Sequence, residues 1–245
     1  TRDNHVGNVG LYQLSYSRLQ QRGNIKVAKI SVKKMVGFTL AICLALMACT
    51  PADEDPLTSE QVQSRWHNSQ GAVYMDQHNY TRGRAEFEQA LTIDAEFATA
   101  HANLGIALYS LGKFDSARAQ LLTCLRLAPQ HLHANYTLGL IDHALGGNYE
   151  RALDAFSTVA DADGEDPLVQ YYLGRTLSKL GRADESLRAY GRAIELDPNF
   201  LSAHYARAHE LRQLQRIDQW REALTVFDRL SRAGFEGVST TYQGQ

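Results

Sequence analysis

The sequence predicts an all-α fold, a solenoid of about five stacked helical hairpins. Three observations lead to this prediction. Small and large apolar residues recur with a period of 34 or 35 residues from about position 64 onward. Glycine or proline stands at matching places in successive units. No segment alternates apolar and polar residues in the way that a half-buried strand does.

The repeated residues divide each unit into two helices that cross closely. Units start near 64, 98, 132, 167 and 201. A small residue in the first helix, such as Gly105, Gly139 or Gly174, lets the second helix approach. Further small residues open the second helices, and larger ones fill the space around them, namely Phe87, Leu121, Phe156, Tyr190 and Phe227.

Breaks in the pattern predict where the helices end. Gly112 and Gly181 are expected to stop the first helices of two units. Pro129, Pro167 and Pro198 are expected to mark helix ends or starts, because proline lacks the N–H group and clashes inside a helix. The third unit has an extra residue at its Gly146-Gly147 turn. The fifth is expected to have a longer turn around 217–219, so that Ala223 opens its second helix.

Two units carry the pattern most fully, ATAHANLGIALYSLGKFDSARAQLLTCLRLAPQH (98–131) and PLVQYYLGRTLSKLGRADESLRAYGRAIELDPNF (167–200). They resemble the tetratricopeptide repeat, and five registered units cover most of the chain. The resemblance implies a right-handed solenoid that binds other proteins. Such a protein catalyses nothing by itself, and its terminal units need a polar outer face.

The segment before the repeats predicts membrane targeting. Lys33-Lys34 precede an apolar run, 36–48, whose helix would be about 20 Å long, shorter than a bilayer core of about 30 Å. A basic flank followed by a short apolar stretch is typical of a secretory signal. Leu46-Met47-Ala48-Cys49 resembles the lipobox of bacterial lipoproteins. The resemblance implies diacylation of Cys49 and, because Thr50 follows, an outer-membrane location facing the periplasm. A retained signal anchor and a secreted protein cleaved elsewhere are the alternatives.

The predicted organisation therefore has four parts. Residues 1–48 form an N-terminal extension with the signal peptide, and 49–58 form an acidic tether. Residues 59–233 form the solenoid, with units near 64–97, 98–131, 132–166, 167–200 and 201–233. Residues 234–245 are a tail or the start of a further domain. That second option makes the repeats an adaptor for an effector or enzymatic domain beyond the C-terminus.

Charge and motif content argue against other classes of function. Residues 49–245 hold 18 basic and 26 acidic residues, and an acidic surface does not attract nucleic-acid phosphates. No nucleophile elbow, phosphate-binding loop, dinucleotide fingerprint or zinc-protease motif occurs, so we expect no catalytic residues, cofactor or metal. His67, His101 and His204 share one place in three units, which favours packing. The acidic run 161–166 lacks the calcium-loop pattern.

The resemblance also implies where partners bind. In this family the first helices line a concave groove that holds extended or helical peptides. At the corresponding places Tyr136, Tyr171 and Tyr205 recur in three successive units, which predicts a ladder of tyrosines. Tyrosine and arginine are enriched at binding hot spots, and packing is the alternative role for the tyrosines. We expect aromatic or acidic peptide segments to contact Tyr109, Tyr136, Tyr171, Arg175, Lys179, Tyr205, His209 and Arg212.

Overall fold

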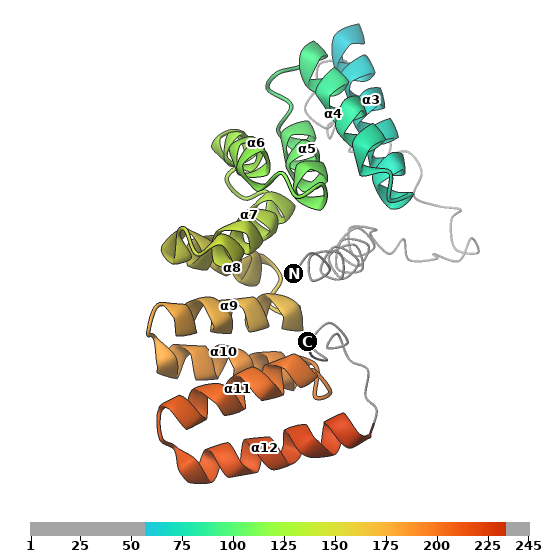
Figure 1. Ribbon diagram of the computed structural model, residues 1–245. Helices are drawn as coiled ribbons and strands as arrows, with labels where there is room; N and C mark the ends of the chain where they lie inside the picture. Colours follow the sequence, from blue (N-terminus) through green and yellow to red (C-terminus); the bar gives the residue numbers. More distant parts are fainter. Residues whose placement is uncertain (1–56, 234–245) are drawn as a thin grey trace, which may run out of the picture.

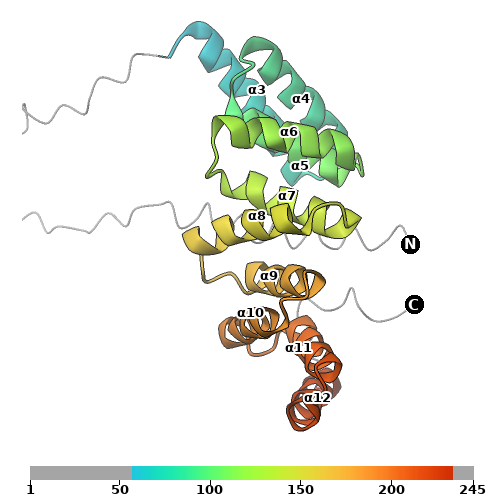
Figure 2. The ribbon, with the colours of Figure 1, turned by 90° about the vertical axis from the view of Figure 1, so that its left-hand side faces the viewer.

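The computed structural model describes residues 57–233, and across this range all regular secondary structure is α-helical. Ten helices pair in sequence into five hairpins that stack into a curved array (Figure 1, Figure 2). The predicted all-α hairpin solenoid is therefore confirmed. The helices are α3 (Ser59–Asp76), α4 (Tyr80–Ile93), α5 (Ala98–Ser110), α6 (Phe114–Leu127), α7 (Leu132–Leu145), α8 (Tyr149–Ala162), α9 (Pro167–Lys179), α10 (Ala183–Leu196), α11 (Leu201–Gln213) and α12 (Ile217–Arg232).

Each hairpin turn contains one residue with a positive φ angle. Gly112, Gly146 and Gly181 adopt φ angles of 71°, 65° and 73°, as expected for residues that end a helix. His78 and Gln215 adopt φ angles of 57° and 56° at the matching places of the first and last hairpins. Both accept a left-handed conformation that glycine adopts without steric cost. The extra residue in the third turn is present, since α8 begins two residues beyond Gly147.

The fifth turn corrects one prediction. The expected longer turn at 217–219 is wrong, because α12 already begins at Ile217. Trp220, rather than Ala223, therefore stands where Ser186 stands in the preceding hairpin. Its half-buried indole packs against a small cluster that contains Ala208 and Leu211.

Close contact between the two helices of a hairpin depends on glycine. A Cβ atom on Gly105 would lie 2.7 Å from Leu121, and one on Gly139 would lie 2.8 Å from the ring of Phe156. A Cβ atom on Gly174 would likewise lie 2.6 Å from the ring of Tyr190. These distances are well inside van der Waals contact, so the large residue of the second helix occupies the space that a side chain would need.

The hairpins stack in two rows. Helices α3, α5, α7, α9 and α11 each contact the next helix of the same row. The second helices mainly contact their own hairpin and the first helix of the following one. Because the first helices lie closer together, they form the inner row of the curve and the second helices form the outer row (Figure 1).

One junction replaces an apolar contact by a buried ion cluster. Asp142 on α7 is fully buried at a place where the other units carry tyrosine or leucine. Its carboxylate accepts hydrogen bonds from Arg151 at 2.5 and 2.8 Å and from Arg118 on α6 at 3.0 Å. Two guanidinium groups thus compensate the buried charge and tie the second hairpin to the third.

The predicted signal segment 1–48, the lipidation residue Cys49, most of the tether and the tail 234–245 lie outside the described residues. Within 57–233, no helix combines the length and the apolar character needed to cross a bilayer.

Replacing the glycine of a hairpin contact should destabilise the solenoid. We expect Gly139→Val to lower the free energy of unfolding by about 2 kcal/mol, because its side chain would overlap the buried ring of Phe156. Gly191→Val on α10 is the matched control, since a Cβ there meets nothing within 4 Å. Urea unfolding followed by circular dichroism measures both, and equal midpoints would contradict the packing argument.

Candidate peptide-binding surface

The structure places the predicted contact residues on four helices of the inner row. Tyr109 lies on α5 and Tyr136 on α7. The remaining residues lie on two helices that contact each other, α9 and α11, and are Tyr171, Arg175, Lys179, Tyr205, His209 and Arg212. The predicted set is thus densest in the last two hairpins.

Three of the four tyrosines are buried. Tyr109, Tyr136 and Tyr171 are 8%, 6% and 6% exposed and belong to the apolar core. The Tyr136 ring lies 5.9 Å from that of Phe156, and the Tyr171 ring lies 5.2 Å from that of Phe200. Burial raises the pKa of Tyr109 to about 12. These three tyrosines therefore have a packing role.

Tyr205 differs from the other tyrosines because it is 54% exposed. Its ring stacks against the ring of His209, one turn later, at 6.4 Å between centroids, and lies 5.5 Å from that of Phe227. No described hairpin follows to cover it. Tyr205 therefore combines a supported ring with an accessible face, which suits an aromatic anchor for a partner.

Basic residues lie on the same two inner helices, α9 and α11, as this exposed tyrosine. Lys179, His209 and Arg212 are exposed. The guanidinium of Arg175 is half-buried and lies over the rings of Tyr171 and Tyr172, 5.6 and 5.8 Å from their centroids. Such contacts hold the arginine in place without removing its charge.

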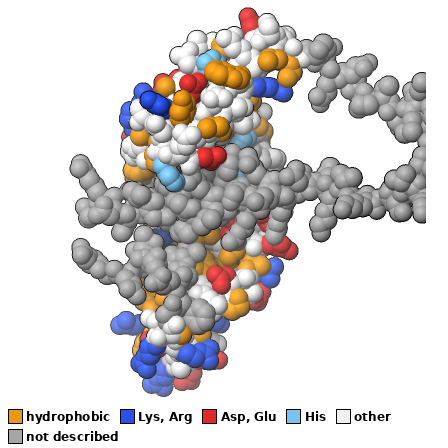
Figure 3. Space-filling view, turned by 90° about the vertical axis from the view of Figure 1, so that its right-hand side faces the viewer, with side chains coloured by type: hydrophobic (Ala, Val, Ile, Leu, Met, Phe, Trp, Pro, Cys, Tyr) orange, Lys and Arg blue, Asp and Glu red, His pale blue; other side chains and the backbone are white. Residues whose placement is uncertain are grey.

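The last hairpin is basic, whereas the rest of the described solenoid is acidic. Residues 201–233 contain six arginines and four acidic residues, but 59–200 contain twelve basic and eighteen acidic residues. Figure 3 shows basic side chains gathered at the lower end of the solenoid, over α11 and α12. This end is the part of the described solenoid best suited to an acidic partner.

Polar links join neighbouring inner helices at matching places. His143 Nδ1 of α7 lies 3.1 Å from Thr176 Oγ1 of α9. Ser178 Oγ of α9 donates to Glu210 of α11 at 2.6 Å. Glu210 is only 4% exposed, and sequence reasoning missed it. The available signal was a charged residue where the other units carry Val73, Ala107, Ile141 and Thr176.

The surroundings of the inner helices also lower the pKa of one histidine, His143. The pKa of His143 is lowered from 6.5 to about 4, first by burial and then by the positive charges of Arg175 and Lys179. His143 is therefore neutral at pH 7, and its ring packs against the rings of Tyr149 and Tyr172.

The remaining candidate groups have structural partners. His67 Nδ1 lies 2.8 Å from Glu86, and His101 Nδ1 lies 2.7 Å from Gln120. Cys124 is fully buried, and burial raises the pKa of its thiol to about 11. Among residues 57–233 no group of three or more histidine, cysteine or acidic side chains is arranged to hold a metal ion.

Comparison with protein families identifies the repeats. A family model described as "Tetratricopeptide repeat" matches residues 69–131 and 103–167, and a second model of that description matches 167–200. Together they span 69–200, which is more than half of the 245 residues.

Curated relatives match over short stretches. The peroxisomal targeting signal receptor of Candida glabrata is 34% identical over 68 residues, 28% of this chain and 11% of the receptor. The unc-45 homolog B of Xenopus tropicalis is 31% identical over 103 residues, 42% of this chain and 11% of that protein. The chain thus spans about a tenth of the length of these relatives.

Solved structures match over most of the chain. A structure of MamA AMB-1 aligns with a TM-score of 0.64 at 25% identity, covering 69% of this chain and 99% of that one. MamA from Desulfovibrio magneticus aligns with a TM-score of 0.66 at 18% identity over 74% of this chain and all of its own. YrrB, described as a TPR protein with an unusual peptide-binding site, aligns at 0.64 and 19% identity, covering 69% of this chain and 86% of its own.

Acid should weaken the fold through His143. Its lowered pKa means that the folded state disfavours the protonated form. Neutral His143 therefore contributes to the free energy of unfolding in full above about pH 6.5, and this contribution is lost as the pH falls toward 4. We expect the free energy of unfolding to drop between pH 7.5 and 5.0 by about 1–2 kcal/mol more in the wild type than in His143→Gln. Urea titrations at both pH values measure the difference, and equal drops would show that His143 does not cause the loss of stability.

Proposed function

This chain is a tetratricopeptide repeat protein, and from that premise we propose that it is a non-catalytic scaffold that binds partner peptides on its inner surface. We place recognition on α9 and α11, in the last two hairpins. The preferred partner segment is extended or helical and carries acidic and aromatic residues.

The observation that carries this proposal is the exposed ring of Tyr205, stacked on His209, on the two helices that also carry exposed Lys179 and Arg212. An aromatic ring supplies contact area at a low entropy cost, and the cations attract carboxylates. The hydrogen bond from Ser178 to Glu210 links the two helices. The surface is therefore already organised before a partner arrives, which lowers the cost of binding.

Two named similarities support the binding of peptides. One curated relative is described as a receptor for a targeting signal, and YrrB is described as having a peptide-binding site. We extend peptide binding from those proteins to this chain, and we assign the partner's charge from the residues of this chain alone.

Reversing two exposed charges should weaken the binding of an acidic peptide. The probe is a fluorescein-labelled peptide of alternating glutamate and phenylalanine, with a lysine–phenylalanine peptide for comparison. We expect Lys179→Glu/Arg212→Glu to weaken binding of the acidic peptide by about tenfold, measured by fluorescence anisotropy. Tyr205→Ala should weaken binding of both peptides, because it removes the shared aromatic contact.

The matched control is Arg126→Glu/Arg188→Glu, which makes the same charge change at exposed places on the outer helices α6 and α10. It should leave peptide affinity nearly unchanged. If both double variants lose the same affinity, only net charge matters and the proposed surface is wrong. Arg175 is left intact in this test because it lies over two tyrosine rings.

We further propose that the scaffold is anchored in a bacterial cell envelope through lipid on Cys49, on the periplasmic side of the outer membrane. The sequence Leu46-Met47-Ala48-Cys49 after a short apolar run supports this anchor. The acidic stretch that follows would act as a tether and keep the solenoid clear of the bilayer surface.

Removing the lipidation residue should release the protein from the membrane. In bacteria that express the full chain with labelled palmitate, the wild type should incorporate label and Cys49→Ala should incorporate none. Cys43→Ala is the matched control, since it lies inside the apolar run and should keep the label. Label that survives Cys49→Ala, or its absence from the wild type, would contradict a lipid anchor at this residue.

A further inference from the structure

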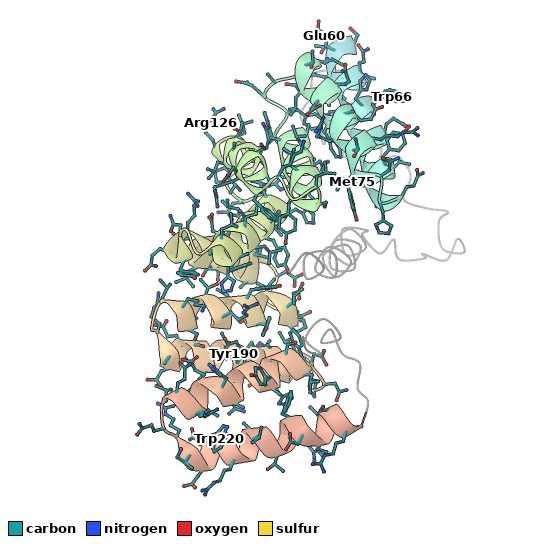
Figure 4. All side chains as sticks on the ribbon, in the orientation of Figure 1. Glu60, Trp66, Met75, Arg126, Tyr190 and Trp220 are labelled. Atoms are coloured by element: carbon teal, nitrogen blue, oxygen red, sulfur yellow. The ribbon has the colours of Figure 1, made fainter. Side chains whose placement is uncertain are left out.

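The first helix of the solenoid carries an exposed apolar stripe. Val62, Trp66 and Val73 on α3 are 53%, 55% and 46% exposed. With Ser69 they are spaced four, three and four residues apart, so they share one face of the helix. Figure 4 shows Trp66 on the side of α3 that points away from α5.

In every later hairpin the same face is buried. The place of Trp66 is taken by residues that are at most 2% exposed, namely Ala100, Ala134, Val169 and Ala203. The place of Val73 is taken by residues that are at most 4% exposed, namely Ala107, Ile141, Thr176 and Glu210. Their cover is the preceding hairpin, as the contact between Ser178 and Glu210 illustrates. No described hairpin precedes α3, so its stacking face has no cover within 57–233.

The stripe extends beyond the repeat pattern. Helix α3 has 18 residues, whereas α5, α9 and α11 have 13 and α7 has 14. The additional turn begins at a capping box, in which Thr58 and Gln61 exchange side-chain hydrogen bonds with backbone N–H groups. It carries Val62, which lengthens the apolar face. A helix extended and capped to present one more apolar residue is well suited to a partner helix.

We propose that this stripe pairs with the same stripe of a second copy of the chain, in an antiparallel contact of the two α3 helices around a twofold axis. In that arrangement Val62 faces Val73 of the other copy, and each indole of Trp66 lies over the small Ser69 of the other copy. Such an isologous contact covers both stripes at once.

The charges of the two solenoid ends favour this occupant. The stripe itself is uncharged, and α3 contains only Glu60, Arg65 and Asp76. The other end of the solenoid, α12, carries charged residues along its length, which makes head-to-tail stacking on an apolar stripe unfavourable. A single arginine on α3 gives an anionic bilayer little to attract.

The test uses two differently tagged copies of the full-length protein, co-expressed and isolated in mild detergent. Wild-type copies should capture each other, and Val62→Glu/Val73→Glu in both copies should reduce capture by about tenfold or more, because it places charges in an apolar contact. Leu122→Glu/Leu145→Glu is the matched control, since these leucines are 41% and 49% exposed on α6 and α7. It should leave capture unchanged.

A second readout follows the indole directly. The chain has two tryptophans, so Trp66 is the only one in Trp220→Phe. Its emission should shift to shorter wavelength as protein concentration rises, and the shift should vanish with Val62→Glu/Val73→Glu. Capture that is absent from the wild type or insensitive to the stripe variant would overturn the proposal. So would an emission shift that appears only when phosphatidylglycerol vesicles are added. Peptide binding on α9 and α11 is independent of either result.

Discussion

The close approach of two helices within each hairpin is the constraint on which the rest of the structure depends. Glycine at one place of the first helix lets the ring or branched side chain of the second helix lie against the backbone. A hairpin closed in this way still exposes apolar faces on both sides, so it is stable only when other hairpins stack on it. Stacking in turn aligns the first helices as an inner row, and the inner row supplies the surface that partners reach.

Most of the tyrosines that recur on the inner helices are buried in the core, so they are not exposed for binding a partner. Tyr136 and Tyr171 stand at matching places in successive hairpins, and both are held in clusters of aromatic rings. Tyr205 stands at the same place but is exposed, because no described hairpin follows its own. The same position thus serves the core inside the array and a surface at its end. This difference is why the proposed recognition site lies at the basic C-terminal end rather than along the whole inner row.

Two acidic side chains are buried at junctions between hairpins, and each has a polar partner on a neighbouring helix. Asp142 occupies an apolar place of the repeat and is accompanied by two arginines from neighbouring helices. Glu210 occupies another such place and is held by Ser178. A buried carboxyl group without partners would be destabilising, so these contacts satisfy both side chains and at the same time link neighbouring helices. At the N-terminal end the stack instead presents an uncharged apolar face, which sets the two ends apart chemically.

The sequence by itself determined the helical hairpins, their period, the glycine turns at Gly112 and Gly181, and the Gly–aromatic contacts, because these depend on residues close together in one unit. It misplaced the start of α12, since Trp220 breaks the small-residue pattern that would have set the register. Only the tertiary structure decided that Tyr171 is buried while Tyr205 is exposed, that Arg118 and Arg151 converge on Asp142, and that Trp66 lies on an open face. The physical reason is that burial in a solenoid is set by the neighbouring hairpin. Equivalent places in the sequence therefore have different surroundings at the ends and in the middle of the stack.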